Sequence, residues 1–74
     1  MKKLSARSTV GMQIALHRQS QGLTQDELAE KSGVHRTNVN KIERGAYNVS
    51  VDILDKICTA LNLEITLTDK SSII

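Results

Sequence analysis

A short polar stretch between residues 36 and 44 carries most of the side chains in this 74-residue chain that could recognise another molecule. They are long or small hydrogen-bonding groups, and Glu43 is the only acid among them. Base edges in a DNA major groove offer donors, acceptors and the thymine methyl group, so such a face suits base recognition. The alternative is an ordinary solvated helix face, which usually mixes both signs of charge. The stretch therefore predicts five base-reading residues: Arg36, Thr37, Asn38, Asn40 and Lys41.

The remaining reactive side chains do not suggest a catalytic or metal site. The two histidines, His17 and His35, are expected on different helices, and Cys58 is the only cysteine. The sequence has no carboxylate pair and no glycine-rich phosphate loop, so we predict a protein that is not an enzyme and uses no cofactor or metal. Tyr47 is the only aromatic residue, which argues against a stacking platform for single-stranded nucleic acid.

Charge is distributed unevenly along the chain. Residues 1–45 hold eight Lys or Arg against four acids, a balance of +4, whereas residues 46–74 hold two Lys against four acids, a balance of −2. This asymmetry suits a protein with one face toward phosphate and the other toward something else. The sequence also lacks a membrane-spanning run and the apolar core of a signal peptide, so we expect one cytoplasmic domain with no membrane contact.

Capping residues and apolar spacing divide the chain into helices that would position the polar stretch. The first helix is expected over about 8–21, with Ser8 or Thr9 as its N-cap. The second begins at Thr24, because Thr24-Gln25-Asp26-Glu27 reads as a capping box, and it ends at Gly33. The third, over about 35–44, would pack through Val39 and Ile42.

A fourth helix is expected from Ser50 to Asn62. Its inner stripe at helical spacing is predicted to be Val51, Leu54, Ile57, Cys58 and Leu61. Residues 1–7 are expected to form a flexible basic arm, and residues 70–74 a tail.

The period of the apolar residues changes after Asn62. Leu63, Ile65 and Leu67 alternate with polar residues, which predicts a half-buried strand over 63–69. The chain offers no second strand to pair with it, so we expect these three residues to pair with the same strand of a second subunit in a homodimer. Two alternatives are that the segment extends the fourth helix or lies over the core as a loop.

Residues 25–44 would form two short helices that meet at a steep angle, with the small Ala29 at their crossing and Gly33 in the turn. The sequence therefore predicts an all-α fold, a four- to five-helix repressor-like helix-turn-helix domain over residues 8–62, with a short C-terminal β-strand that pairs across a dimer.

The run Gly22-Leu23-Thr24-Gln25…Leu28-Ala29…Gly33-Val34…Lys41-Ile42-Glu43-Arg44-Gly45 resembles the Cro and phage-repressor type of helix-turn-helix, also called the XRE-like family. The resemblance covers roughly residues 10–62. It implies that Arg36 and Thr37 read bases, with Lys41 one turn later, and that Arg18 and Glu43 form a structural pair. The resemblance and the capping positions together place six residues along the DNA backbone: Thr24, Gln25, His35, Arg44, Tyr47 and Asn48.

One position departs from that family, because His35 stands where the cap of the recognition helix is usually Ser or Thr. The segment from Ser50 to Asp69 also resembles the end of HipB-type antitoxins, in which a short strand after the last helix pairs between subunits. That second resemblance implies operator DNA and a HipA-type kinase-like toxin as partners. We expect a homodimeric repressor of its own operon that acts as such an antitoxin. The alternatives are a free-standing phage-type repressor, a restriction–modification controller, or a protein-interaction adaptor that binds no DNA.

Overall fold

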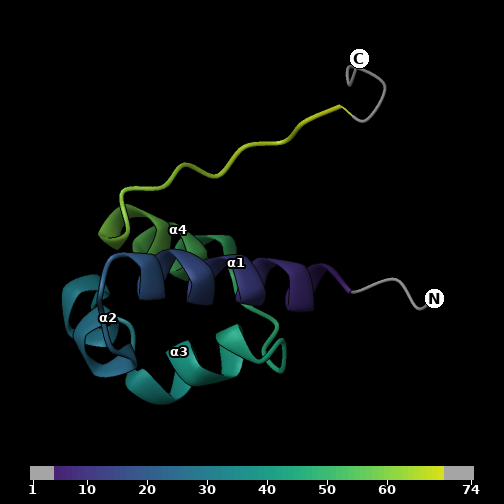
Figure 1. Cartoon of the computed structure of the whole chain (residues 1–74). Helices are drawn as coiled ribbons and strands as arrows, with labels where there is room; N and C mark the ends of the chain where they lie inside the picture. Colours follow the sequence, from purple (N-terminus) through teal and green to yellow (C-terminus); the bar gives the residue numbers. More distant parts are fainter. Residues whose placement is uncertain (1–4, 70–74) are drawn as a thin grey trace.

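The computed structural model describes residues 5–69, and four helices follow one another in them. These are α1 (Ala6–Ser20), α2 (Gln25–Ser32), α3 (Arg36–Glu43) and α4 (Val51–Ala60), as Figure 1 shows. The expected all-helical, helix-turn-helix architecture is thereby confirmed for this part of the chain. Residues 1–4 of the expected arm and the expected tail over 70–74 lie outside the described residues.

The first helix begins earlier than its sequence suggested. Ser5 is the N-cap, and its hydroxyl accepts a hydrogen bond from the backbone N–H of Ser8 at 3.1 Å. Ala6 and Arg7 are therefore part of α1 and not of an N-terminal arm. Ser5, Ser8 and Thr9 are all competent caps, so the sequence alone did not distinguish them.

The other helix ends follow their local signals. The Thr24 hydroxyl accepts from the Glu27 N–H at 3.0 Å, and the Glu27 carboxylate accepts from the Thr24 N–H at 2.8 Å, which completes the capping box. These bonds lower the pKa of Glu27. Gly33 and Asn62 adopt the left-handed φ values of 74° and 59° that end α2 and the turn after α4.

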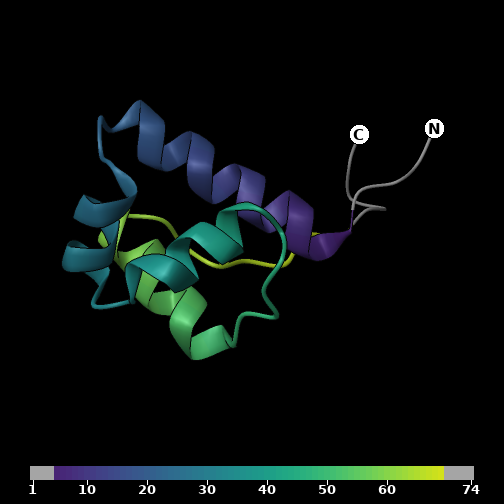
Figure 2. The ribbon, with the colours of Figure 1, turned by 90° about the horizontal axis from the view of Figure 1, so that it is seen from below.

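Side chains from all four helices form one apolar core. α3 packs against α1 and α2, and α2 packs against α4. Figure 2 shows α3 in front of α4 with α1 crossing beside it. Val51 is a correction to the expected inner stripe, because it lies in the first turn of α4 and is 73% exposed. The buried core residues are Ile14, Leu28, Val34, Val39, Ile42, Ile57, Cys58 and Leu61.

Gly11 marks the closest approach between α1 and the end of α3. A β-carbon on Gly11 would overlap the backbone carbonyl oxygen of Ile42 and lie 3.0 Å from that of Glu43. A short distance away, a β-carbon on Gly45 would lie 2.7 Å from the Ser8 hydroxyl oxygen. α1 therefore supports the C-terminal end of α3 and the loop that follows it through backbone contacts that only glycine permits.

The strand expected over 63–69 is not seen among residues 5–69 of the single chain. α4 ends at Ala60 and Asn62 turns the backbone, and the segment then runs extended over α1 and α4, on the side opposite to α3 (Figure 1). Leu63 and Ile65 line a hollow with Val10 and Leu54. The segment has no strand to pair with in residues 5–69, and a strand requires such a partner.

Candidate nucleic-acid interface

Helix α3 presents one face to solvent along one side of the molecule, below α1 in Figure 1. Val39 and Ile42 are buried and fix its inner face. Four of the predicted contact residues are exposed on its outer side, and two are half-buried. The exposed residues are Arg36, Thr37, Lys41 and Arg44, and the half-buried ones are Asn38 and Asn40.

Arg36 forms an ion pair that sequence reasoning missed. Its Nε lies 2.7 Å from Oδ1 of Asp26, which is in the first turn of α2. The two side chains are 64% and 72% exposed, so the pair contributes about 0–1 kcal/mol and exchanges readily with another acceptor. In the sequence Asp26 stood out only as part of the capping-box motif at Thr24, and nothing indicated that it faces α3.

Arg18 of α1 and Glu43 of α3, the residues expected to pair, are joined through two hydrogen bonds. Arg18 Nε and a terminal guanidinium nitrogen donate to the two Glu43 carboxylate oxygens at 2.7 and 3.0 Å, and the other terminal nitrogen donates to the Leu23 carbonyl at 2.7 Å. The side chains are only 12% and 6% exposed. The hydrogen bond to Glu43 raises the pKa of Arg18, whose guanidinium is charged in any case.

Hydrogen bonds continue from this pair to the outer face. Gln25 Nε2 donates to Glu43 Oε1 at 3.0 Å, and Asn40 Nδ2 donates to Gln25 Oε1 at 3.2 Å. Arg44 Nε in turn donates to Asn40 Oδ1 at 3.0 Å. The side chains of Gln25 and Asn40 are therefore hydrogen-bonded to each other and to neighbouring side chains of the helix-turn-helix. The spacing of Asn40 and Arg44, one helical turn apart, was the only sequence signal for any of these contacts.

His35 caps α3 in place of the usual hydroxyl residue. Its Nδ1 accepts a hydrogen bond from the backbone N–H of Thr37 at 3.1 Å. A ring that accepts through Nδ1 carries its proton on Nε2, which leaves the Nε2–H as its donor. Nδ1 cannot accept the capping bond and donate to a phosphate at the same time. A phosphate contact from His35 that keeps the cap would therefore come from Nε2.

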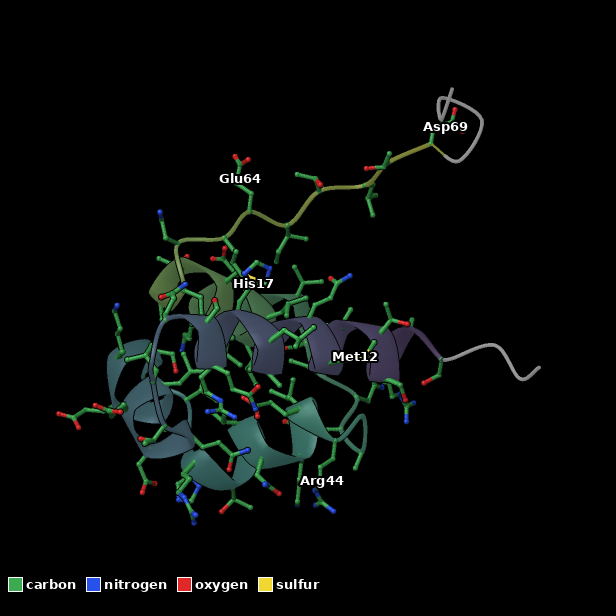
Figure 3. The ribbon with its side chains drawn as sticks, in the orientation of Figure 1. Met12, His17, Arg44, Glu64 and Asp69 are labelled. Atoms are coloured by element: carbon green, nitrogen blue, oxygen red, sulfur yellow. The ribbon has the colours of Figure 1, made fainter. Side chains whose placement is uncertain are left out.

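The loop after α3 holds the last two predicted backbone contacts. Asn48 is exposed, whereas Tyr47 is half-buried and packs against the core. Figure 3 places Arg44 on this side of the molecule, and it places His17 and Glu64 on the other side. The Thr24 hydroxyl, also expected near the DNA backbone, accepts its capping bond from the Glu27 N–H and keeps its own O–H as a donor.

Three further observations concern features away from this face. Within residues 5–69, no group of three His, Cys, Asp or Glu side chains is placed to hold a metal ion. Burial raises the pKa of the Cys58 thiol, so it stays protonated and packs as a small core residue. No helix of the described segment has the length and apolar content needed to cross a membrane.

Comparison with known proteins places this arrangement in a family. The helix-turn-helix family model HTH_3 matches residues 14–67. The chain is 44% identical over 48 residues to an uncharacterized HTH-type transcriptional regulator of Methanothermobacter thermautotrophicus, covering 65% of this chain and 70% of the relative. It is 38% identical over 58 residues to the immunity repressor protein of Bacillus phage phi105, covering 78% of this chain but 40% of the repressor. Antitoxin HipB of Escherichia coli O6:H1 is 32% identical over 68 residues, covering 92% of this chain and 72% of HipB.

Comparison with solved structures also finds proteins of the same fold. The restriction-modification controller protein C.AhdI from Aeromonas hydrophila superposes with a TM-score of 0.76 at 38% identity, covering 78% of this chain and 88% of that one. The controller C.Esp1396I, solved as a tetramer with its 35 base-pair operator, gives 0.77 at 32% identity, covering 84% and 82%. A HipB variant in complex with an O2 20mer gives 0.79 at 30% identity, covering 95% and 97%. The chain therefore belongs to the HTH_3 helix-turn-helix family, as its XRE-like resemblance indicated.

Proposed function

We propose that this protein is a homodimeric transcriptional repressor that binds operator DNA in a sequence-specific manner. The observation that carries the proposal is the exposed outer face of α3, which offers only neutral or cationic side chains and is braced by the buried Arg18–Glu43 pair. The controller C.Esp1396I, solved in complex with its 35 base-pair operator, has the same fold and supports the same use of it here.

In this proposal α3 enters the major groove and Arg36 leaves Asp26 to contact guanine through two hydrogen bonds. Thr37, Asn38 and Lys41 are the other base-reading candidates. Loss of one good base contact would cost about 1–3 kcal/mol and relax the preference at one base pair. Phosphate contacts would come from the positions along the backbone path: Thr24, Gln25, His35, Arg44, Tyr47 and Asn48.

The experiment that tests DNA binding is a shift assay on the promoter upstream of the gene, repeated over a range of salt. If a dimer neutralises about six phosphates, log K should fall with log salt at a slope near −5. Arg44→Ala should reduce that slope by about 2 per dimer, since each subunit loses one phosphate contact. Lys56→Ala in α4 is the matched control and should leave the slope unchanged. A flat salt response would contradict the proposal.

Dimerisation is proposed through the extended segment after α4. Leu67 is 99% exposed, and Ile65 together with Met12 and Leu16 of α1 also exposes apolar surface. Pairing this segment with its copy would cover apolar atoms and supply the missing strand partner. Two α3 helices could then enter successive major grooves about 34–36 Å apart.

Leu67→Lys should yield a monomer in sedimentation and weaken operator binding, because a single domain loses the second half-site. Thr66→Lys adds the same charge one residue earlier, on the other face of an extended segment, and should leave the dimer intact. A dimer that survives Leu67→Lys would place the interface elsewhere, for example on α4.

An antitoxin role with a HipA-type kinase-like partner is the more specific form of the proposal. The HipB relatives support it, because they match nearly the whole chain. A free-standing phage-type repressor or a restriction–modification controller is supported by the phi105 and C.AhdI matches, and a protein-binding adaptor is the rival class. Co-purification with the product of the neighbouring gene separates these. A kinase-like partner supports the antitoxin, and a DNA shift with no partner supports an autorepressor.

A further inference from the structure

We infer that Asn40 is a positioning residue that carries the fixed orientation of the buried Arg18–Glu43 pair to Arg44, and that it does not read a base. This inference deepens the proposed function and rests on it. It replaces the expectation from sequence that Asn40 belongs with Arg36, Thr37, Asn38 and Lys41 among the base-reading residues.

The argument begins with the position of Glu43. Its carboxylate is 6% exposed and accepts two hydrogen bonds from Arg18, so it is held in one orientation against α1. An ionised carboxylate only accepts hydrogen bonds. The Gln25 side chain that also contacts Glu43 Oε1 must therefore present its NH2 group, at 3.0 Å.

The same reasoning fixes the next two groups. Because the Gln25 NH2 points to Glu43, its Oε1 faces Asn40 and can only accept. Asn40 must then turn its own NH2 toward Gln25, at 3.2 Å, and its Oδ1 is left to accept from Arg44 Nε at 3.0 Å. The charge of Glu43 thus sets the orientation of two successive amides, and each amide has one arrangement that satisfies all of its neighbours.

This chain of bonds determines what Arg44 can do. Its Nε is occupied by Asn40, so its two terminal nitrogens remain to contact phosphate at the exposed end of α3. A guanidinium that is already oriented loses less side-chain freedom on binding than a free one. Ordering one such side chain changes affinity by roughly threefold to tenfold.

Asn38 provides a natural comparison on the same helix. It is half-buried like Asn40, but no side-chain hydrogen bond is found for it within residues 5–69. To read a base, Asn40 would have to release both Gln25 and Arg44, whereas Asn38 has no such bonds to break.

The test compares Asn40→Ala and Asn38→Ala against operator duplexes that carry each single base change. Asn40→Ala should weaken all duplexes by the same factor, roughly threefold to tenfold per half-site, with no change in base preference. Arg44→Ala should then cost much less in the Asn40→Ala background than in the wild type. Asn38→Ala should relax the preference at one base pair. A relaxed preference in Asn40→Ala, or additive losses for Asn40 and Arg44, would overturn the inference.

A second readout needs no DNA. In the free protein, the side-chain NH2 resonances of Gln25 should move in Asn40→Ala and stay in place in Asn38→Ala. Asn40→Leu keeps the side-chain volume and should move them as well, which guards against a folding defect in the alanine variant. Unmoved Gln25 resonances would overturn the inference. Moved resonances in a protein that binds no duplex would overturn the proposed function, and with it the role of Asn40 toward DNA, while leaving the hydrogen-bond chain intact.

Discussion

Replacing Gly11 with alanine gives the sharpest test of how α1 supports α3, because two physical arguments predict opposite signs. Gly11 lies in the interior of α1, where alanine is favoured over glycine by about 1 kcal/mol of helix propensity. Propensity alone therefore predicts a more stable protein. The structure predicts a less stable one, because the new β-carbon would overlap the Ile42 carbonyl oxygen and press on that of Glu43.

The size of the loss follows from what would have to move. Both obstructing atoms belong to the backbone, so no rotamer change relieves the overlap, and α1 must shift away from the end of α3. Overpacking of this kind costs about 1–3 kcal/mol, which exceeds the propensity gain in most of that range. The severe overlap with the Ile42 oxygen places the cost in the upper part of that range. After the propensity gain is subtracted, we expect Gly11→Ala to be less stable by on the order of 1–2 kcal/mol. A domain of this size has roughly 4–11 kcal/mol in total.

The assay is urea unfolding at one fixed protein concentration, since the apparent stability of a dimer depends on concentration. The exposed position Gln19 in the same helix supplies the control, where the difference between Gln19→Ala and Gln19→Gly measures propensity without a steric conflict. That difference should favour alanine. If Gly11→Ala stabilises the protein as much as the control exchange does, the close approach of α1 to α3 is refuted.

Three further predictions concern the charged groups. Arg18→Met leaves the buried Glu43 carboxylate without its partner and should lower the free energy of unfolding by about 3–5 kcal/mol in thermal or urea unfolding. The double variant Arg18→Met/Glu43→Leu should recover part of that loss. Equal losses in the two variants would contradict a buried pair. Asp26→Asn releases Arg36 from a pair that contributes about 0–1 kcal/mol, so it should tighten binding to all duplexes by up to about fivefold in a titration at low salt. Weaker binding would argue against the ion pair. Because the pKa of Glu27 is lowered, its contribution to stability is present above the ordinary carboxyl pKa of 4.5 and is lost as the pH falls through the lower folded-state value. Glu27→Gln should therefore flatten the pH dependence of the unfolding midpoint in that acidic range. An unaltered profile would count against the capping box.

The helix boundaries could be predicted where the signal is local. The capping box at Thr24, the left-handed Gly33 and the N-cap Ser50 act through residues within four positions, and all three behave as their types indicate. The start of α1 could not be chosen in this way, because Ser8 is packed beneath the backbone of Gly45 and Ser5 caps instead. That preference depends on a contact between residues far apart in sequence.

The candidate site shows the same division. The residue types of α3 indicated its polar face, and the buried positions of Val39 and Ile42 follow from their spacing. The sequence could not separate Asn38 from Asn40, since the two have the same chemistry and differ only in what the crossing of α2 brings near them. The strand expected over residues 63–69 likewise depends on a partner that one chain does not contain.

The placement of that C-terminal segment also bears on how the proposed activities combine. The segment covers α1 and α4, whereas α3 lies on the far side of the core, as Figures 1 and 2 agree. A second subunit that pairs with Leu67, or a partner that contacts the acidic Glu64 beside it, would leave the outer face of Arg36 uncovered. Dimerisation or partner binding on this side would therefore act on DNA affinity by setting the distance between two α3 helices. It would not act by competing for the base-reading face.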